Sequence, residues 1–344
     1  MIFKDEQFFI LVKRFLTMYL PKQKCYSDNT IKSYTLSINL FLDFLRDEKE
    51  TPLQKVCFAE IDHYVIAEFL DWLTQARGCG NSTRNQRLNA LRSFLKFAAF
   101  ENPSLTAIYM EADKVPKAKT VQAAVEFMSH TAMQALLRQP DVTAPRGVRD
   151  RFLMILLYDT GARISEIMNL RLRDISASDN QPHVYLIGKG SKPRIVPLME
   201  KTKAHFTQYL DLFHPQGIRN TNDYLFYTII HNHKNRMSAD NAASFISRYA
   251  DQARQHCKEI PPKVHPHMFR HTRAMDLYRG GMPLPLVQQF LGHSEMKTTL
   301  VYAFADTEMK RKAILKADPD NICNAEAPVW IDDEQLLRKL YGLR

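Results

Sequence analysis

The sequence predicts a mainly α-helical fold with a small β-sheet, divided into two domains. A length of 344 residues gives a prior of about two domains. Apolar residues recur at helical spacing along most of the first part of the chain. Two short runs rich in β-branched residues flank a glycine-containing turn further on, which indicates a β-hairpin. With 45% hydrophobic residues the chain can bury a substantial core, so global disorder is not expected.

Three helices are predicted before residue 103. Residues 27–30 (Ser-Asp-Asn-Thr) supply N-cap candidates for the first helix, whose apolar side chains repeat over residues 31–45. The second helix is expected from about residue 61 to residue 75, and the third from about residue 82. Asn102-Pro103 ends the third helix, because proline disfavours helical geometry in the residue before it.

A polar and basic segment at residues 112–121 is predicted to be an interdomain linker, because it is nearly free of large hydrophobic side chains. It separates a helical domain, residues 1–111, from a second domain, residues 122–325. The sequence Asp-Pro-Asp at residues 318–320 breaks the chain before a C-terminal tail, residues 326–344.

The second domain mixes helices with the hairpin. Residues 184–187 and 195–198 are predicted as its two strands. An apolar run at residues 151–158 leads to a Thr-Gly break. Arg163 and Glu166 follow on the next helix, where a spacing of three residues places them on one face.

The charge of the chain favours a polyanionic partner. The formal net charge is +10, and nearly all of the excess lies after residue 111. Residues 1–111 hold 14 Lys+Arg against 13 Asp+Glu, while residues 112–344 hold 33 against 24. If the partner is DNA, the second domain is expected to dominate non-specific attraction to phosphates.

The five cysteines are scattered and form no C-x-x-C pair, which argues against a disulfide framework and against a cysteine-rich zinc site. Asp5 and Glu6 stand where a signal peptide would carry basic residues. No apolar run approaches the roughly 18 residues of a membrane span. The expected location is a reducing cytoplasm, or the nucleoid within it.

A tyrosine, Tyr302, follows a series of basic side chains in the second domain. A tyrosine hydroxyl has a pKa of about 10, so it is a poor nucleophile at neutral pH. To attack a phosphodiester it needs a proton acceptor and fixed cations that stabilise the charge gained by the phosphate. The series that precedes it comprises Arg163, Lys189, His267, Arg270 and His293, with the acidic Glu166 close to the first arginine.

Four sequence boxes carry this series. Residues 157–166 (Leu-Tyr-Asp-Thr-Gly-Ala-Arg-Ile-Ser-Glu) resemble the first-arginine box of the tyrosine recombinases, which include phage integrases and Xer-type recombinases. Residues 188–194 (Gly-Lys-Gly-Ser-Lys-Pro-Arg) resemble the hairpin that carries the catalytic lysine of that family. Residues 267–271 resemble its H-x-L-R-H box, with Phe269 in place of leucine. Residues 291–302 resemble its L-G-H-S…T-T-x-x-Y segment, and four boxes in order are a specific signal.

The resemblance implies an N-terminal helical core-binding domain with a SAM-like fold, and a mixed, mostly helical catalytic domain with a small sheet. The implied activity is site-specific DNA recombination. Tyr302 would attack a DNA phosphate, form a 3′-phosphotyrosine and release a 5′ hydroxyl that attacks the phosphotyrosine of a partner strand. Because the covalent link keeps the bond energy, no metal, ATP or other cofactor is expected.

The resemblance also assigns roles to individual side chains. Arg163 and Arg270 are expected on the two non-bridging oxygens of the scissile phosphate, which suits the planar guanidinium. Glu166 is expected to hold a cation or an imidazole in place.

Lys189 is expected to act as the general acid that protonates the leaving 5′ oxygen, with Lys192 on the same hairpin as a competitor. His267 is expected to accept the tyrosine proton or to donate to the phosphate. His293 is expected to donate a hydrogen bond to a phosphate oxygen, and His271 is expected to be structural.

Further cations are expected to contact the DNA backbone. A solvated helix face and a solubilising linker are the ordinary alternatives, and the sequence leaves them open. In the family, the helical bundle and the linker close around the duplex as a clamp. The expected contacts are Arg84, Arg87, Arg92, Lys96, Lys117, Lys119, Lys192 and Arg194.

The expected partners are double-stranded recombination sites, further copies of the chain and accessory DNA-bending proteins. A monomer in solution would assemble as a homotetramer on two sites. In the tail, the apolar residues at 336, 337, 340 and 341 follow an acidic run, as expected for a short amphipathic helix. Such a helix is unstable alone and must dock, either on its own domain or on a neighbouring subunit. The resemblance favours the neighbour.

Three alternatives compete with the recombinase hypothesis. His267 and His271 form H-x-x-x-H, but Met268 stands where a zinc protease of the H-E-x-x-H type needs glutamate. A type IB topoisomerase would use similar chemistry on one duplex. A non-catalytic DNA-binding regulator would keep the fold without the reaction, and the complete set of site residues argues against it.

Overall fold

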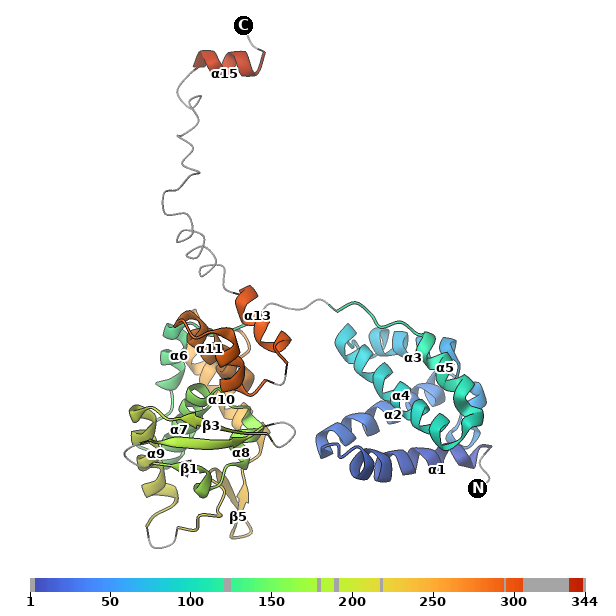
Figure 1. Ribbon diagram of the computed structural model, residues 1–344, viewed down its shortest axis with the longest axis horizontal. Helices are drawn as coiled ribbons and strands as arrows, with labels where there is room; N and C mark the ends of the chain where they lie inside the picture. Colours follow the sequence, from blue (N-terminus) through green and yellow to red (C-terminus); the bar gives the residue numbers. More distant parts are fainter. Residues whose placement is uncertain are drawn as a thin grey trace. The chain divides into compact units, whose positions relative to one another are not determined.

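The computed structural model describes residues 4–120, 125–177, 181–188, 192–216, 219–293, 295–305 and 334–342 of the chain. The chain forms two compact units, Met1–Gln122 and Ala123–Arg344 (Figure 1). The first unit is helical, and the second combines helices with two small antiparallel sheets. The predicted mainly α-helical fold is therefore confirmed. The second sheet was missed by the sequence prediction.

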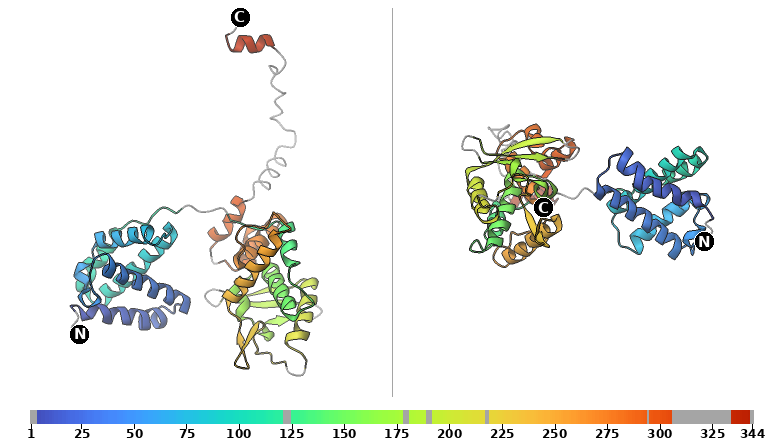
Figure 2. Two further views of the ribbon diagram at one scale, coloured as in Figure 1. Left: turned by 180° about the vertical axis from the view of Figure 1, so that it is seen from behind. Right: turned by 90° about the horizontal axis from the view of Figure 1, so that it is seen from below.

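Figure 2 shows the helices of the first unit packed against one another. Their core is rich in aromatic rings. Phe94 lies at its centre, with its ring centroid 5.7 Å from that of Phe8 and 5.5 Å from that of Phe15. The helices are α1 (Glu6–Arg14), which continues into the π-helical Phe15–Gln23, α2 (Asp28–Asp47), α3 (His63–Gln75), α4 (Asn81–Glu101) and α5 (Thr106–Lys114).

The helix boundaries follow the local signals in the sequence. The hydroxyl of Ser27 accepts the backbone N–H three residues on, and the carboxylate of Asp62 does the same for α3. At the end of α4, Asn102 is extended, with φ −136° and ψ 101°, directly before Pro103. The three helices predicted for this region are confirmed.

The segment expected as a linker begins inside the first unit. Ala112 is fully buried within α5, and Val115 is buried just after it. Arg92 of α4 donates hydrogen bonds to the carbonyl oxygens of Ala112, Asp113 and Val115. Further along, Asn85 pairs with both backbone groups of Ala118. Residues 112–118 thus lie along α4.

The second unit contains the sheet strands and the remaining helices. In chain order its elements are α6 (His130–Leu137), α7 (Pro145–Thr160), α8 (Ile164–Asn169), β1 (Ile175–Ser176), β2 (His183–Ile187), β3 (Pro193–Pro197), α9 (Glu200–Phe213), β4 (Tyr227–Ile230), β5 (His233–Arg236), α10 (Ala239–Arg254), α11 (Pro266–Arg279), α12 (Leu284–Leu291), α13 (Lys297–Ala305) and α15 (Glu334–Leu340).

Helix α7 is the centre of this unit. Most of its side chains are buried, and it packs against α6, α8, α9, α10 and α11. Its second half carries the apolar run that the sequence pattern identified. A helix buried on most sides gives a rigid support for the residues that follow it.

Strands β1, β2 and β3 form an antiparallel sheet in that order, in which Tyr185 pairs with Ile195 and Leu186 with Arg194. Val184, Leu186 and Val196 are buried on one face of it, as strand alternation requires. Tyr185 and Ile195 are exposed on the other face. The predicted hairpin is confirmed.

Within the described residues, no helix is long and apolar enough to cross a membrane. In the tail, α15 begins at Glu334, as the acidic run predicted, and Leu336, Leu340 and Tyr341 are exposed. The start of the predicted tail, residues 326–333, lies outside the described residues.

Arg92 generates a test of the first unit. We expect Arg92→Ala to lower the free energy of unfolding of the first unit by about 2 kcal/mol, because the charged hydrogen bonds from Arg92 to the end of α5 are lost. In a Trp330→Phe background Trp72 is the sole tryptophan, so its fluorescence follows unfolding of this unit. Exposed Lys96→Ala is the control. Equal stability of the two variants would contradict the anchoring role.

Candidate active site

The turn after α7 places the first arginine. Gly161 adopts a left-handed conformation, with φ 56°, which favours glycine. A Cβ atom there would lie 2.9 Å from Cδ2 of Leu291, so a larger residue would strain the backbone and clash with α12. The Thr160 hydroxyl accepts the backbone N–H of Ala162 and donates to a carbonyl of α7. Arg163 is thereby held at the N-cap of α8.

Glu166 joins two arginines at the start of α8. One carboxylate oxygen accepts the Nη1–H of Arg163 at 2.9 Å, and the other accepts the Nη2–H of Arg194 at 2.6 Å and the backbone N–H of Arg163 at 2.9 Å. Burial acts to raise the pKa of Glu166, but the hydrogen bonds from Arg194 and Arg163 lower it below its ordinary value. The carboxylate is therefore ionised and holds both cations in place.

Arg194 was expected to contact the DNA backbone, and here its guanidinium pairs with Glu166. Its Nε and Nη1 groups are buried and have no hydrogen-bond partner among the described residues. Unpaired buried donors are costly in a folded protein. Such donors, next to a second arginine, suit an anion that binds from outside.

Arg270 is 2% exposed and lies between two helix ends. Its Nη1 donates to the carbonyl oxygen of Gly161 at 2.8 Å, and its Nη2 donates to that of Leu291 at 2.7 Å. Burial, and then the charge of Arg163, lower the pKa of Arg270 to about 10. The guanidinium remains charged at neutral pH. It fixes α11 to the end of α7 and to the end of α12.

Tyr302 lies on α13, and its side chain is buried against α11 and α12. Its hydroxyl lies 3.0 Å from Nδ1 of His271. Burial raises the pKa of Tyr302 to about 12, against the charges of Arg270 and Arg163. The hydroxyl is consequently protonated at neutral pH in this conformation.

The structure places His271, and not His267, next to the Tyr302 hydroxyl. His271 was expected to be structural, and His267 was expected to receive the tyrosine proton. Both lie on α11, with ring centroids 6.2 Å apart. Burial and the neighbouring His267 lower the pKa of His271 to about 4, so its imidazole is neutral and can accept a proton. The spacing of four residues between His267 and His271 places both on one face of a helix, but it does not show which imidazole contacts α13.

His293 follows the left-handed Gly292 at the end of α12. Its Nδ1 lies 2.9 Å from the hydroxyl of the buried Thr299. Burial, and then the charges of Arg270 and Arg163, lower its pKa to about 4. Burial and Arg270 also lower the pKa of His267. Burial, and then the charges of the nearby arginines, thus keep His267 and His293 neutral.

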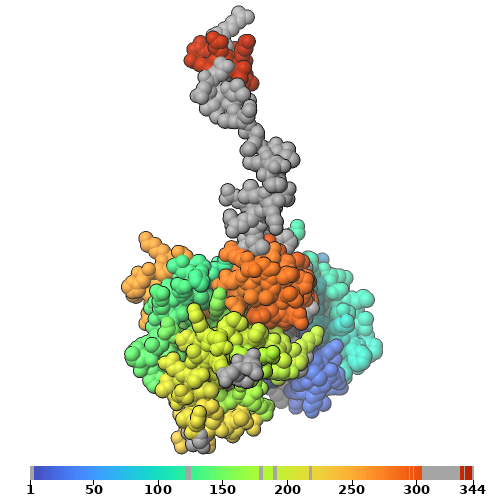
Figure 3. Space-filling model, turned by 60° about the vertical axis from the view of Figure 1, so that its left-hand side comes forward, coloured from blue at the N-terminus to red at the C-terminus, as the bar shows by residue number. Residues whose placement is uncertain are grey.

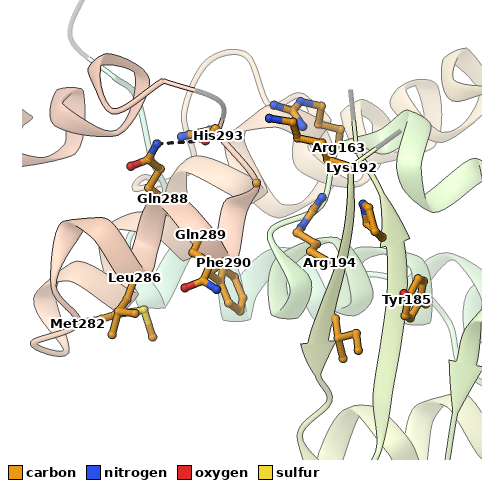
Figure 4. Close-up of a pocket in the computed structure, with 14 residues that line it drawn as sticks. Arg163, Tyr185, Lys192, Arg194, Met282, Leu286, Gln288, Gln289, Phe290 and His293 are labelled. Atoms are coloured by element: carbon orange, nitrogen blue, oxygen red, sulfur yellow. Dashed lines mark hydrogen bonds between the residues drawn. The ribbon is translucent and has the colours of Figure 1, made fainter. Parts of the chain in front are cut away.

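A groove of about 1000 Å³ runs between the sheet and α12 (Figure 4). Arg163, Lys192, Arg194 and His293 line it together with apolar side chains of both elements. The space-filling view shows the surfaces of α11 and α12 (orange) next to those of the sheet and α9 (yellow-green) on one face (Figure 3). Lys192 is exposed, and Lys189 lies outside the described residues.

The predicted cations of the first unit differ in what they do. Arg87 of α4 bonds to Ser33 and Ser37 of α2, and Arg92 bonds to the end of α5, so both stabilise the bundle. One nitrogen of Arg84 is buried. The exposed members of the predicted set in this unit are Lys96, Lys117 and Lys119.

Over the described ranges, no group of three His, Cys, Asp or Glu side chains is arranged to hold a metal ion. The arrangement is instead a set of three arginines around one carboxylate, next to a tyrosine hydroxyl that contacts a neutral imidazole. Such a set is suited to phosphoryl transfer through a tyrosine.

Family models match both units. The model of the phage integrase family covers residues 126–309, which is more than half of the chain. The chain belongs to the phage integrase family. The model of the phage integrase N-terminal SAM-like domain covers residues 12–102, in the first unit. The recognition of the tyrosine recombinases from the sequence boxes is confirmed, and with it the class of enzyme: a site-specific recombinase.

Known relatives of this integrase extend over nearly its full length. The protein y4rC of Sinorhizobium fredii, named as an integrase/recombinase, is 31% identical over 90% of this chain and 91% of its own length. Tyrosine recombinase XerD of Staphylococcus epidermidis is 29% identical over 88% of this chain and 96% of its own. The fold is similar to that of the XerH site-specific recombinase bound to a palindromic difH substrate, with TM-score 0.67, 19% identity, and coverage of 92% and 90%.

The depressed histidine pKa values predict how the stability of the integrase depends on pH. The unfolded chain takes up protons below about pH 6.5, whereas His271 and His293 stay neutral in the folded state until about pH 4. Their contribution to stability is present above pH 6.5 and is lost as the pH falls toward 4. Urea midpoints measured by circular dichroism between pH 7 and 4.5 test this.

We expect the double variant His271→Gln/His293→Gln to show a shallower fall in the midpoint than the wild type. Substitution of the exposed His233 by glutamine is the control and should leave the fall unchanged. An equally steep fall in the double variant would show that other groups cause the acid sensitivity.

Proposed function

We propose that this recombinase cleaves DNA by attack of the Tyr302 hydroxyl on a backbone phosphate, with His271 as the proton acceptor. The observation that carries the proposal is the 3.0 Å contact between the Tyr302 hydroxyl and Nδ1 of His271, which is neutral. The bond from the tyrosine oxygen to phosphorus forms, and the bond from phosphorus to the 5′ oxygen breaks. The tyrosine proton passes to His271, and the 5′ oxygen takes a proton from the general acid.

The three arginines would bind the phosphate. Arg270 uses two of its five N–H groups on backbone carbonyls, which leaves three for an anion. Arg163 opens onto the groove, and Arg194 carries unpaired donors beside it. Arg163 and Arg270 are proposed on the non-bridging oxygens, with Glu166 holding Arg163 and with His293 as a neutral donor.

In this structure Tyr302 is 1% exposed. A DNA phosphate can therefore reach its hydroxyl only after α13 moves, and Tyr302 and His271 must be in contact once α13 has moved. We include that movement in the proposed cycle: α13 keeps the nucleophile protonated and covered until DNA is bound. Exposure would remove the burial that raises the pKa of Tyr302 and would leave the charges of Arg270 and Arg163, which lower it.

The assignment of the nucleophile and of its base is tested with a nicked duplex that carries the recombination site. Tyr302→Phe should abolish the covalent adduct on denaturing gels and retain DNA binding, because a single oxygen is removed. His271→Ala should slow adduct formation more than His267→Ala, since only His271 contacts the nucleophile. Adduct formation by Tyr302→Phe would refute the nucleophile, and a greater loss in His267→Ala would move the base to His267.

We propose Lys189 as the general acid. A substrate with a 5′-bridging phosphorothiolate has a leaving group that needs no proton, so it should restore cleavage by Lys189→Ala. Rates of adduct formation on the normal and the sulfur-containing duplex measure this. Lys192→Ala is the matched control on the same hairpin. Rescue of Lys192→Ala, and no rescue of Lys189→Ala, would assign the acid to Lys192.

We propose that the enzyme acts on double-stranded recombination sites as a homotetramer on two sites, with accessory DNA-bending proteins, in the cytoplasm. The first unit, the linker and the exposed Lys96, Lys117, Lys119 and Lys192 would contact the DNA backbone as a clamp. Support comes from structures of similar fold in complex with DNA, such as the Tn1549 transposon integrase on circular intermediate DNA, with TM-score 0.63, 17% identity, and coverage of 90% of this chain and 98% of that one.

The tail, residues 326–344, is proposed to pass to a neighbouring subunit. The exposed apolar side chains of α15 supply a docking face. Deletion of the tail should preserve binding to a single site, measured by gel shift, and should impair pairing and joining of two duplexes. A truncated protein that joins two duplexes like the full chain would refute exchange. A truncated protein that unfolds would show that the tail docks on its own catalytic domain.

A further inference from the structure

Besides the ion pairs of Glu166, an ion pair between Asp159 and Arg273 lies near the end of α7. Asp159 is the penultimate residue of α7, four positions before Arg163, and it is 6% exposed. Its Oδ1 atom accepts the Nη2–H of Arg273 of α11 at 3.2 Å. Its Oδ2 atom accepts the hydroxyl of Thr202 at 2.8 Å and the backbone N–H of Met199 at 3.4 Å, both at the start of α9. One carboxylate therefore ties three elements together.

These three elements carry the three arginines of the active site. The end of α7 leads into Arg163, α11 carries Arg270, and the start of α9 follows the strand that carries Arg194. Relative movement of any two of the elements would change the distances between the guanidinium groups. Asp159 and Arg273 lie at the junction of the three elements.

Two aromatic rings also lie next to Arg273. Its guanidinium lies 5.3 Å from the ring centroid of Tyr158 and 5.9 Å from that of Phe290 of α12. The Tyr158 hydroxyl donates to Asp276 at 2.7 Å. Residues 270, 273 and 276 of α11, one per turn, thus each bond to the end of α7.

We propose that Asp159 and Arg273 are positioning residues for DNA cleavage: they set the spacing of Arg163 and Arg270 around the scissile phosphate. The inference rests on the function proposed above. Neither side chain lines the groove or bonds to Tyr302. Their effect reaches the reaction through the arginines, and errors of about 1 Å in such a site can cost about 100-fold in rate.

A similar ion pair at the other end of α7 supplies a matched control. Arg149 donates two hydrogen bonds to Asp150, which is 2% exposed. Tyr249 donates to the same carboxylate, and Arg149 lies over the ring of Phe245. Its residue types and burial resemble those of the Asp159–Arg273 pair. Both of its members lie on α7, and their contacts with Tyr249 and Phe245 join α7 to α10, which carries none of the three arginines.

The test measures single-turnover adduct formation by the full chain on the nicked duplex, with DNA binding and the thermal midpoint measured alongside. Arg273→Met should slow adduct formation by about 10- to 100-fold at unchanged DNA affinity. Arg149→Met should lower the thermal midpoint by a similar amount and leave the cleavage rate unchanged. Arg273→Lys, which keeps the charge and one donor, should recover part of the rate.

A double-mutant cycle separates positioning from a general loss of stability. If Arg273 acts through Arg163, Arg273→Met should lose most of its effect in an Arg163→Ala background. Asp159→Asn should also lose most of its effect in the Arg163→Ala background. If Arg273→Met does not fold, Asp159→Asn replaces it in the cycle.

The inference is overturned if the folded variants cleave at the wild-type rate, if Arg149→Met slows cleavage equally, or if the effects add fully to that of Arg163→Ala. Absence of an adduct with the wild-type protein would instead reject the proposed function itself. The wild-type lane of each assay thus distinguishes the two failures.

Discussion

The buried guanidinium of Arg270 is the interaction on which the catalytic unit depends. A charge removed from water is tolerated only where hydrogen bonds replace the lost hydration. Here the carbonyl oxygens of Gly161 and Leu291 provide them, at the C-terminal ends of α7 and α12. Helix C-termini carry partial negative charge, so a cation is favoured there. Loss of Arg270 would leave two buried carbonyls unpaired, at about 1–3 kcal/mol each.

The same cation links the fold to the chemistry. Arg270, Arg163 and Arg194 carry three positive charges around one carboxylate, Glu166, so the site keeps a net positive charge for an incoming phosphate. Their field also acts on the histidines. The charge of Arg270 lowers the pKa values of His267, His271 and His293, which burial lowers already. Burial, with a smaller effect of these charges, therefore keeps the three imidazoles neutral.

Local patterns in the sequence predicted the helices of the first unit and the main hairpin, because their caps and periodicity depend on neighbouring residues. The four boxes likewise predicted Arg163, Arg270 and Tyr302 as site residues. The contact between His271 and Tyr302 was not predicted, because the packing of α13 decides which imidazole meets the tyrosine. Arg87 and Arg194 were expected to contact DNA, because the sequence does not show the partners that they have within the fold. Arg87 bonds to Ser33 and Ser37, and Arg194 pairs with Glu166, all of them distant in the sequence. Asp159 and Arg273 went unnoticed for the same reason.

The central claim, that Tyr302 forms the covalent link to DNA, can be tested at the level of the peptide. The adduct formed on a nicked site is purified, digested with nuclease and trypsin, and analysed by tandem mass spectrometry. Trypsin cleaves after Lys297 and Lys310, so the nucleophile lies in the peptide of residues 298–310, which contains a single tyrosine. We predict a residual nucleotide phosphate on Tyr302. A nucleotide on any other side chain, with Tyr302 unmodified, would contradict it.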